Sequence, residues 1–238
     1  MNMSQAQLRV VLFEASSEAL DLIWRSYRQC YSSRFAPELK DVPNEEKERF
    51  VKEMVKRGHH SPLEHVKFTF AIEGISRACS HQLVRHRIAS YSQQSQRYVD
   101  MSQFRYVVPP SIAKIPEALE EFQRAMEEIR KSYQKIKDIL RAHGLNDERA
   151  KEDARFLLPQ AAETKIIVTM NVRELLHFFS QRLCSRAQWE IRELAKRMLE
   201  ECKKVLPTIF EEVGPKCVIL GYCPEGQESC GFYLSRKV

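Results

Sequence analysis

An arginine-rich segment between residues 75 and 99 is the part of the sequence best suited to chemistry. Guanidinium groups make paired hydrogen bonds to phosphates and carboxylates, whereas lysine offers a single point charge. Three serines and three glutamines between residues 90 and 97 add neutral donors and acceptors. The segment therefore predicts a site for an anion with several oxygens. It contains neither lysine nor an acidic residue, and its arginines and histidines are Arg77, Arg85, Arg87, Arg97, His81 and His86.

Two predicted elements lead into this segment. Residues 66–73 (VKFTFAIE) alternate apolar and polar side chains and predict a strand. A short helix from Ile75 to about Arg85 then leads into a polar loop that holds the serines and glutamines. Neither a G-x-G-x-x-G motif nor a P-loop is present, and the chain has only seven glycines. Any bound nucleotide must therefore be held by side chains and helix ends.

The remaining elements alternate irregularly along the chain. Because strands and helices intermix without β-α-β regularity, we predict an α+β fold with a mainly antiparallel sheet flanked by long helices. Asn146 and Asn171 are predicted to cap the helices that follow them. Further strands are predicted at 8–14 and 163–170, and helices at 17–31, 43–57, 115–140, 146–158, 171–183 and 191–205. The apolar stripe of the 115–140 helix predicts packing against a neighbour, in the same chain or in another subunit.

Composition narrows the class of protein. With 238 residues, 43% hydrophobic and 29% charged, the chain suits one large globular domain or two small ones. The net charge of +6 fits small anions and nucleic acids equally well. No apolar run approaches the ~20 residues of a membrane span, and residues 8–13 are too short for a secretory signal. With seven cysteines, we expect free thiols in a reducing cytoplasm.

Three blocks of sequence together resemble one enzyme family. The first is R-H-R-x7-S followed by Q-R-Y, from Arg85 to Tyr98; the second is G-H-x-[ST]-P-x-E-H at 58–65. The third is N-x-R at 171–173 with Arg182 and A-Q-x-E-I at 187–191. Over roughly residues 10–210 the chain resembles the flavin-dependent thymidylate synthases. The resemblance implies a homotetramer with active sites between subunits, formed by residues 1–215, followed by a cysteine-containing tail at 216–238.

The resemblance also implies a reaction and a set of site residues. The reaction is the reductive methylation of dUMP to dTMP, with methylenetetrahydrofolate as carbon donor and NADPH as reductant of FAD. Arg182 is the expected catalytic residue, because a guanidinium beside the uracil imide favours its deprotonated form. The expected FAD ligands are Ser61, Arg85, His86, Arg87, Gln93, Asn171, Val172, Arg173 and His177. The expected dUMP ligands are Gln82, Arg85, Gln93, Gln94, Ser95, Gln96, Arg97, Arg155 and Arg182.

Two groups of residues were considered as metal sites. His59, His60 and His65 match neither H-E-x-x-H nor a zinc-finger spacing, so we expect no metal there. The C-x5-C-x6-C spacing of Cys217, Cys223 and Cys230 is not a zinc spacing either. Free thiols are the expectation for this tail. A metal site completed by Cys202 and a disulfide remain the alternatives.

Two other classes of protein compete with this interpretation. A basic nucleic-acid-binding module would use the arginines and glutamines, but the loop lacks lysine and an aromatic stacking pattern. A hydrolase would use Ser95 or a cysteine as nucleophile, but neither a nucleophile elbow nor a paired base is recognisable. We therefore expect no nucleic-acid partner and no membrane association, and we expect Ser95 to bind substrate.

Overall fold

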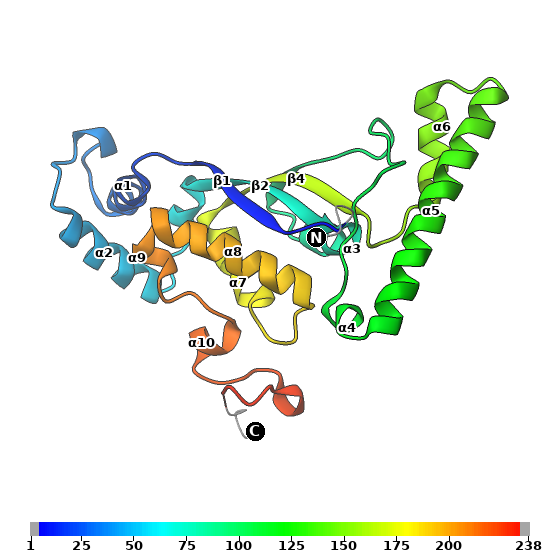
Figure 1. Cartoon of the computed structure of the whole chain (residues 1–238). Helices are drawn as coiled ribbons and strands as arrows, with labels where there is room; N and C mark the ends of the chain where they lie inside the picture. Colours follow the sequence, from blue (N-terminus) through cyan, green and yellow to red (C-terminus); the bar gives the residue numbers. More distant parts are fainter. Residues whose placement is uncertain (1–4, 234–238) are drawn as a thin grey trace. The chain divides into compact units, whose positions relative to one another are not determined.

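The computed structural model describes residues 5–233 and contains one four-stranded sheet with helices between and after its strands (Figure 1). The strands are β1 (Arg9–Ala15), β2 (Lys67–Ser76), β3 (Ala89–Gln93) and β4 (Glu163–Asn171). The helices are α1 (Ala19–Tyr31), α2 (Asn44–Lys56), α3 (Arg77–Leu83), α4 (Pro110–Ala113), α5 (Pro116–Ala142), α6 (Asp147–Ala154), α7 (Val172–Arg182), α8 (Trp189–Val205), α9 (Pro207–Phe210) and α10 (Lys216–Leu220). Short 3-10 turns lie at Ala36–Glu38, Ser61–His65, Arg155–Leu157 and Gly226–Glu228.

The sheet has the strand order β1-β2-β4-β3 and is antiparallel. The Thr69 hydroxyl lies 2.9 Å from that of Thr169, while the Gly74 amide donates to Glu163 at 3.0 Å. From the first pair to the second, the residue number increases along β2 and decreases along β4, so β2 and β4 are antiparallel. The predicted α+β class with an antiparallel sheet is therefore confirmed.

Most predicted elements are confirmed to within a few residues. Asn146 accepts a hydrogen bond from the Arg149 amide at 2.9 Å, as expected of an N-cap. The helix that follows it ends at Ala154 and continues as a 3-10 turn, so it is shorter than predicted. The predicted loop after α3 was wrong at its start, because residues 89–93 form β3. Its A-S-Y-S-Q sequence lacks the apolar alternation that marks a half-buried strand.

The chain divides into two compact units. Within the described residues, the first consists of residues 5–9, 72–85 and 92–167, and the second of residues 10–71, 86–91 and 168–233. In the first unit, α5 packs along α6, as Figure 1 shows at its green end. The core of this unit is a cluster of buried apolar side chains: Met101, Phe104, Tyr106, Val108, Met126, Tyr133, Ala154 and Ala162.

The second unit has an aromatic core. Phe210 packs edge-on against both Phe68 and Phe179, with ring centroids 5.6 and 6.0 Å apart. All three rings are fully buried, so Phe210 of α9 joins α7 to β2 by apolar contact. The predicted boundary between residues 215 and 216 stays a prediction. The helix α10 begins at Lys216.

Among residues 5–233 the longest helix, α5, has 27 residues but is rich in charged side chains, and no helix qualifies as a membrane span.

Candidate functional site

In the first unit, the predicted dUMP ligands Gln82 and Gln93 lie at the ends of two consecutive elements, α3 and β3. Gln82 is in the last turn of α3, whose N-cap Ser76 accepts from the Cys79 amide at 3.0 Å. Gln93 ends β3, and its amide nitrogen donates to the hydroxyls of Ser80 (2.9 Å) and Thr164 (3.1 Å). These bonds fix the amide and direct its carbonyl oxygen away from them.

The turn after β3 holds the serine and glutamines of the signature. The Gln94 amide donates to the Lys165 carbonyl at 2.9 Å, and the Ser95 hydroxyl accepts from the Arg97 amide at 3.2 Å. The side-chain nitrogen of Gln96 is buried and has no hydrogen-bond partner among the described residues. A buried donor without a partner is costly, so the turn is suited to a ligand that supplies an acceptor.

Two arginines of the first unit differ in their partners. Arg97 forms ion pairs with Glu148 at 2.8 Å and Glu152 at 3.2 Å on α6, so its charge is already partly balanced. Arg155 begins a 3-10 turn, and burial together with its charge lowers the pKa of Arg77. Like charges near each other favour an anion between them. Arg155 was already an expected dUMP ligand. Arg77, which the sequence interpretation left unassigned, becomes a second candidate phosphate contact.

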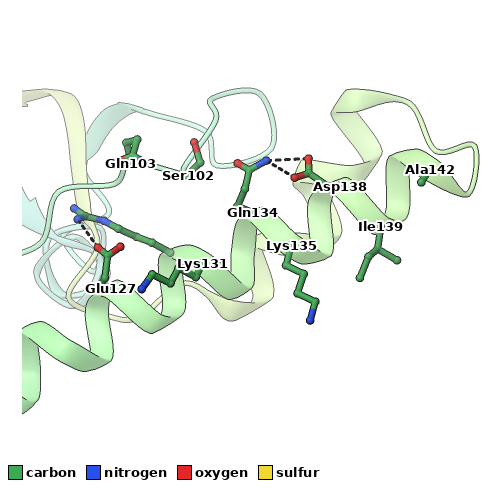
Figure 2. A pocket seen from close by; sticks show the side chains of 10 residues that line it. Ser102, Gln103, Glu127, Lys131, Gln134, Lys135, Asp138, Ile139 and Ala142 are labelled. Carbon is green, nitrogen blue, oxygen red and sulfur yellow. Dashed lines mark hydrogen bonds and ion pairs between the residues drawn. The ribbon is translucent and has the colours of Figure 1, made fainter.

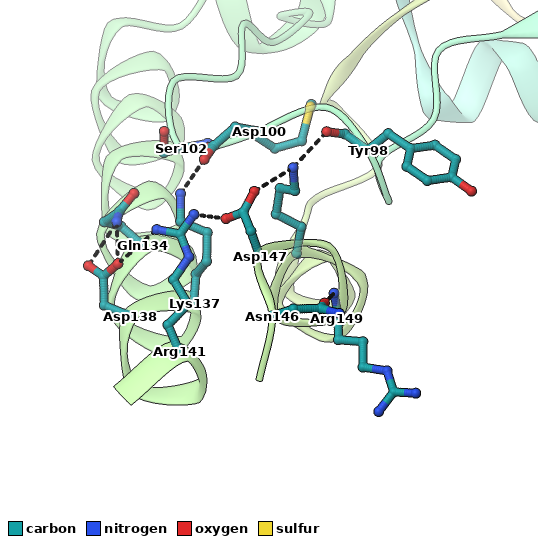
Figure 3. Close-up of polar contacts among 12 residues, drawn as sticks. Tyr98, Asp100, Ser102, Gln134, Lys137, Asp138, Arg141, Asn146, Asp147 and Arg149 are labelled. Carbon is teal, nitrogen blue, oxygen red and sulfur yellow. Dashed lines mark hydrogen bonds and ion pairs between the residues drawn. The ribbon is translucent and has the colours of Figure 1, made fainter. Parts of the chain in front are cut away.

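The segment that follows the turn is anchored to α5 and α6 (Figure 3). Lys151 donates to the Tyr98 carbonyl at 2.8 Å, and the buried Lys137 pairs with Asp100. Burial alone would raise the pKa of Asp100, but hydrogen bonds from Lys137 and Ser102 lower it to about 2. The turn that carries the predicted dUMP ligands is thus tied at its far end to α5 and α6.

In the RHR triplet, the middle residue differs from its neighbours. Arg85 and Arg87 are exposed, and neither has an ion pair with any residue in the described range. His86 is 6% exposed, and its ring packs edge-on against Phe178 at a centroid distance of 4.9 Å. The two outer arginines can therefore meet an anion in solvent, while His86 belongs to the interior of the second unit.

His86 contacts both ends of α7. Its Nδ1 lies 3.3 Å from a carboxylate oxygen of the buried Glu174, and its Nε2 accepts from Arg182 Nε at 3.1 Å. Burial and the Arg182 guanidinium lower the pKa of His86 to about 4, and burial raises the pKa of Glu174. His86 is therefore a neutral imidazole at neutral pH.

The start of α7 carries the predicted N-x-R contacts. Asn171 accepts from the Glu174 amide at 2.8 Å, which confirms the predicted cap. The amides of this helix start can face an anion or a carbonyl oxygen. Arg173 forms an ion pair with Glu64, so the second and third sequence blocks meet in the second unit. Ser61 starts the 3-10 turn that contains Glu64, and it is exposed.

Two of the cavities bear on the predicted site. One, of about 670 Å³, lies along α5 (Figure 2) and is lined by none of the predicted site residues. The other, about 250 Å³, lies in the second unit and is lined by Arg182 and four cysteines: Cys184, Cys217, Cys223 and Cys230. Cys202 is buried and does not line it, so the fourth cysteine beside the tail is Cys184. Within residues 5–233, no group of histidines, cysteines or acids is arranged to hold a metal.

Comparison with known proteins decides the family. Residues 11–208 match the model of the family described as thymidylate synthase complementing protein. The flavin-dependent thymidylate synthase of Nitratidesulfovibrio vulgaris is 50% identical over 242 residues, covering 99% of each chain. The chain belongs to the flavin-dependent thymidylate synthases. The synthases of Clostridium tetani (48% identical, 94% of this chain and 93% of that one) and Pyrococcus furiosus (44%, 92% and 90%) are similar as well.

A solved structure shares the fold. The UMP/dUMP methylase PolB from Streptomyces cacaoi, crystallised with 5-Br dUMP, superposes with a TM-score of 0.75. The alignment covers 87% of this chain and 94% of that one at 22% identity, so it carries the fold alone. As a flavin-dependent thymidylate synthase, the chain is an enzyme of the methyltransferase class.

Sequence interpretation did not identify Glu174 as part of the site. The sequence N-V-R-E at 171–174 has the form of a capping box, and the contact of Glu174 with His86 joins residues 88 positions apart. The available signal in the sequence was an acid in the first turn of a helix that ends on the expected catalytic arginine.

Proposed function

We propose that this protein catalyses the reductive methylation of dUMP to dTMP, with methylenetetrahydrofolate as carbon donor and FAD reduced by NADPH as hydride carrier. The observation that carries the proposal is the 50% identity to a flavin-dependent thymidylate synthase over 99% of both chains. The three sequence blocks that carry the proposed ligands all lie inside this match.

The residues present fit the two nucleotides. FAD and dUMP together bring about four negative charges, and the chain has no glycine-rich loop to receive them. Arg85 and Arg87 are exposed, and neither is paired with an acid among the described residues, so both are suited to phosphate groups. We assign FAD to these two, with Ser61, His86, Gln93, the α7 start at 171–173 and His177. When bound, the reduced flavin supplies the hydride that completes the methyl group.

We assign dUMP to the turn after β3 and to three arginines. The buried, unpartnered amide of Gln96 supports a ligand with a carbonyl or phosphate oxygen in this turn. The other contacts proposed are Gln82, Arg85, Gln93, Gln94, Ser95, Arg97, Arg155 and Arg182. Arg97 would exchange part of its pairing with Glu148 and Glu152 for the ligand.

Within this assignment, Arg182 polarises the uracil. A guanidinium beside the imide favours loss of its proton, which enriches the ring carbon that attacks the methylene. Ser95 binds and does not attack. Its hydroxyl accepts from the Arg97 amide at 3.2 Å, and no hydrogen bond joins it to a histidine or a carboxylate within residues 5–233.

Assembly and location complete the proposal. We propose a homotetramer with sites between subunits, located in the cytoplasm. Subunit contacts would cover large apolar side chains that are exposed in the single chain, among them Phe13, Ile88, Ile115, Ile139 and Phe156. All seven cysteines are free thiols. Light scattering should give four chains per particle, and a monomer that retains stoichiometric FAD would refute the shared site.

The deciding experiment is an assay for dTMP. Purified protein is incubated with dUMP, methylenetetrahydrofolate, NADPH and FAD, and dTMP is separated chromatographically. The expected protein is yellow because it retains FAD, and it forms dTMP only when dUMP, methylenetetrahydrofolate and NADPH are all added. A colourless protein that forms no dTMP and binds single-stranded nucleic acid would refute the proposal in favour of the nucleic-acid module.

A further inference from the structure

His86 makes ring and backbone contacts within the second unit. Its ring packs against Phe178, with the His177 ring centroid 5.8 Å away, and its backbone carbonyl accepts from the Tyr91 hydroxyl at 2.7 Å. A side chain buried to this degree keeps one orientation. Its neighbours Arg85 and Arg87 are exposed. The burial of His86 is therefore specific to its side chain and is not shared by the whole triplet.

The partners of the two ring nitrogens determine the tautomer. Arginine Nε can only donate, so His86 Nε2 must accept at 3.1 Å. In a neutral imidazole the proton then resides on Nδ1, and it is donated to Glu174 at 3.3 Å. A carboxylate behind the ring makes the opposite nitrogen a stronger acceptor. The three side chains thus form one directed chain of hydrogen bonds, from Arg182 through His86 to Glu174.

The geometry of α7 explains why this chain can form. Glu174 is in its first turn and Arg182 is its last residue, about two turns apart. His86 bridges them along the helix and fixes the guanidinium by its Nε edge. The orientation of the Arg182 guanidinium is therefore set by a contact inside the protein.

We infer that Glu174 and His86 are positioning residues, which hold the Arg182 guanidinium in the orientation required for uracil polarisation. The inference rests on the proposed function, in which Arg182 acts on dUMP. It differs from the role that family resemblance gives to His86, because both ring nitrogens are already engaged inside the protein. A contact of His86 with FAD would have to use other atoms of the residue.

The test compares Glu174→Gln with Glu163→Gln. Both carboxylates are buried, at 7% and 8% exposure, but Glu163 pairs with Arg105 in the first unit, outside the proposed site. Glu174→Gln should lower kcat roughly 10- to 100-fold, as loss of an outer-shell partner does, with KM for dUMP and FAD content within about two-fold. Glu163→Gln should lower stability and leave kcat within about two-fold. An equal kcat loss in both variants would overturn the inference.

A double-mutant cycle separates positioning from general damage. In an Arg182→Lys background, Glu174→Gln should cost less than about three-fold in kcat, because nothing is left to orient. Full additivity of the two losses would refute the chain of contacts. If Arg182→Lys alone kept wild-type turnover, the assigned role of Arg182 would fail instead.

A second measurement does not depend on turnover. Nitrogen NMR of histidine-labelled, FAD-loaded enzyme should show His86 as the neutral, Nδ1-protonated tautomer at pH 7 in wild type. Spectra of His86→Gln assign the resonance. A charged ring, or a ring protonated on Nε2, would overturn the inference even in an enzyme that makes dTMP.

Discussion

Acid should destabilise this protein through His86. Burial and the nearby guanidinium of Arg182 lower the pKa of its imidazole from 6.5 to about 4. The unfolded chain therefore binds a proton that the folded protein refuses, between about pH 6.5 and pH 4. Stability from the neutral ring is present above pH 6.5 and is lost as the pH falls through this window. His177 and Glu174 also face the ring, and the Tyr91 hydroxyl donates to the backbone carbonyl of His86.

The size of the effect follows from the two pKa values. Each pKa unit corresponds to about 1.4 kcal/mol, so the full difference is about 3 kcal/mol below pH 4. Between pH 7 and pH 5 the loss is about 2 kcal/mol. For a chain of this length that corresponds to roughly 4–8 °C in Tm.

The assay measures Tm for wild type and His86→Gln at pH 7 and pH 5, with equal, saturating FAD. Wild type should lose about 4–8 °C more than the variant over this interval, because the variant has no imidazole to protonate at this position. The exposed His143 supplies a control, and His143→Gln should follow wild type. An equal decrease in Tm from pH 7 to pH 5 for wild type and His86→Gln would refute the buried neutral imidazole.

Four further outcomes are expected. Gly74→Ala should prevent folding or lower the free energy of unfolding by more than about 4 kcal/mol, because its Cβ would lie 1.8 Å from the Gln7 carbonyl oxygen. Gly58→Ala is the control, because the space around Gly58 is open, and it should lower the free energy of unfolding by about 1–2 kcal/mol. Denaturant titrations measure both. Arg182→Lys should reduce kcat far more than dUMP affinity in steady-state kinetics, because lysine lacks the planar fork. Ser95→Ala should retain activity, with kcat/KM lowered roughly 10- to 150-fold, and a loss near 10⁶-fold would mark it as a nucleophile. Lys137→Met should lower the free energy of unfolding by about 1–2 kcal/mol, and unchanged urea midpoints would exclude the Asp100 anchor.

The sequence predicted the elements well where their ends are chemically marked. Asn146 and Asn171 fix two helix starts through side-chain hydrogen bonds, and the apolar stripe of α5 defines that helix. β3 escaped because its polar sequence pairs through the backbone, which leaves no side-chain pattern to detect.

The candidate site was predicted residue by residue through resemblance, and its internal contacts were not. Glu174 looks like an ordinary capping acid in the sequence, and only the fold brings it to His86, 88 positions earlier. The acid partners of Arg97 and Arg173 likewise come from other elements. Spacing reports what a residue could do, whereas long-range contacts decide which of its atoms are available.

The cysteines around the Arg182 cavity give chemists a covalent entry point. Cys230 is exposed on its wall, and a hydrogen bond from Ser185 lowers the pKa of its thiol, so it is reactive toward alkylating reagents. Burial raises the pKa of Cys217 and leaves it less reactive in the same cavity. An electrophilic fragment attached at Cys230 would therefore be anchored beside the residue expected to polarise uracil, and tethered inhibitor discovery could begin from one surface thiol.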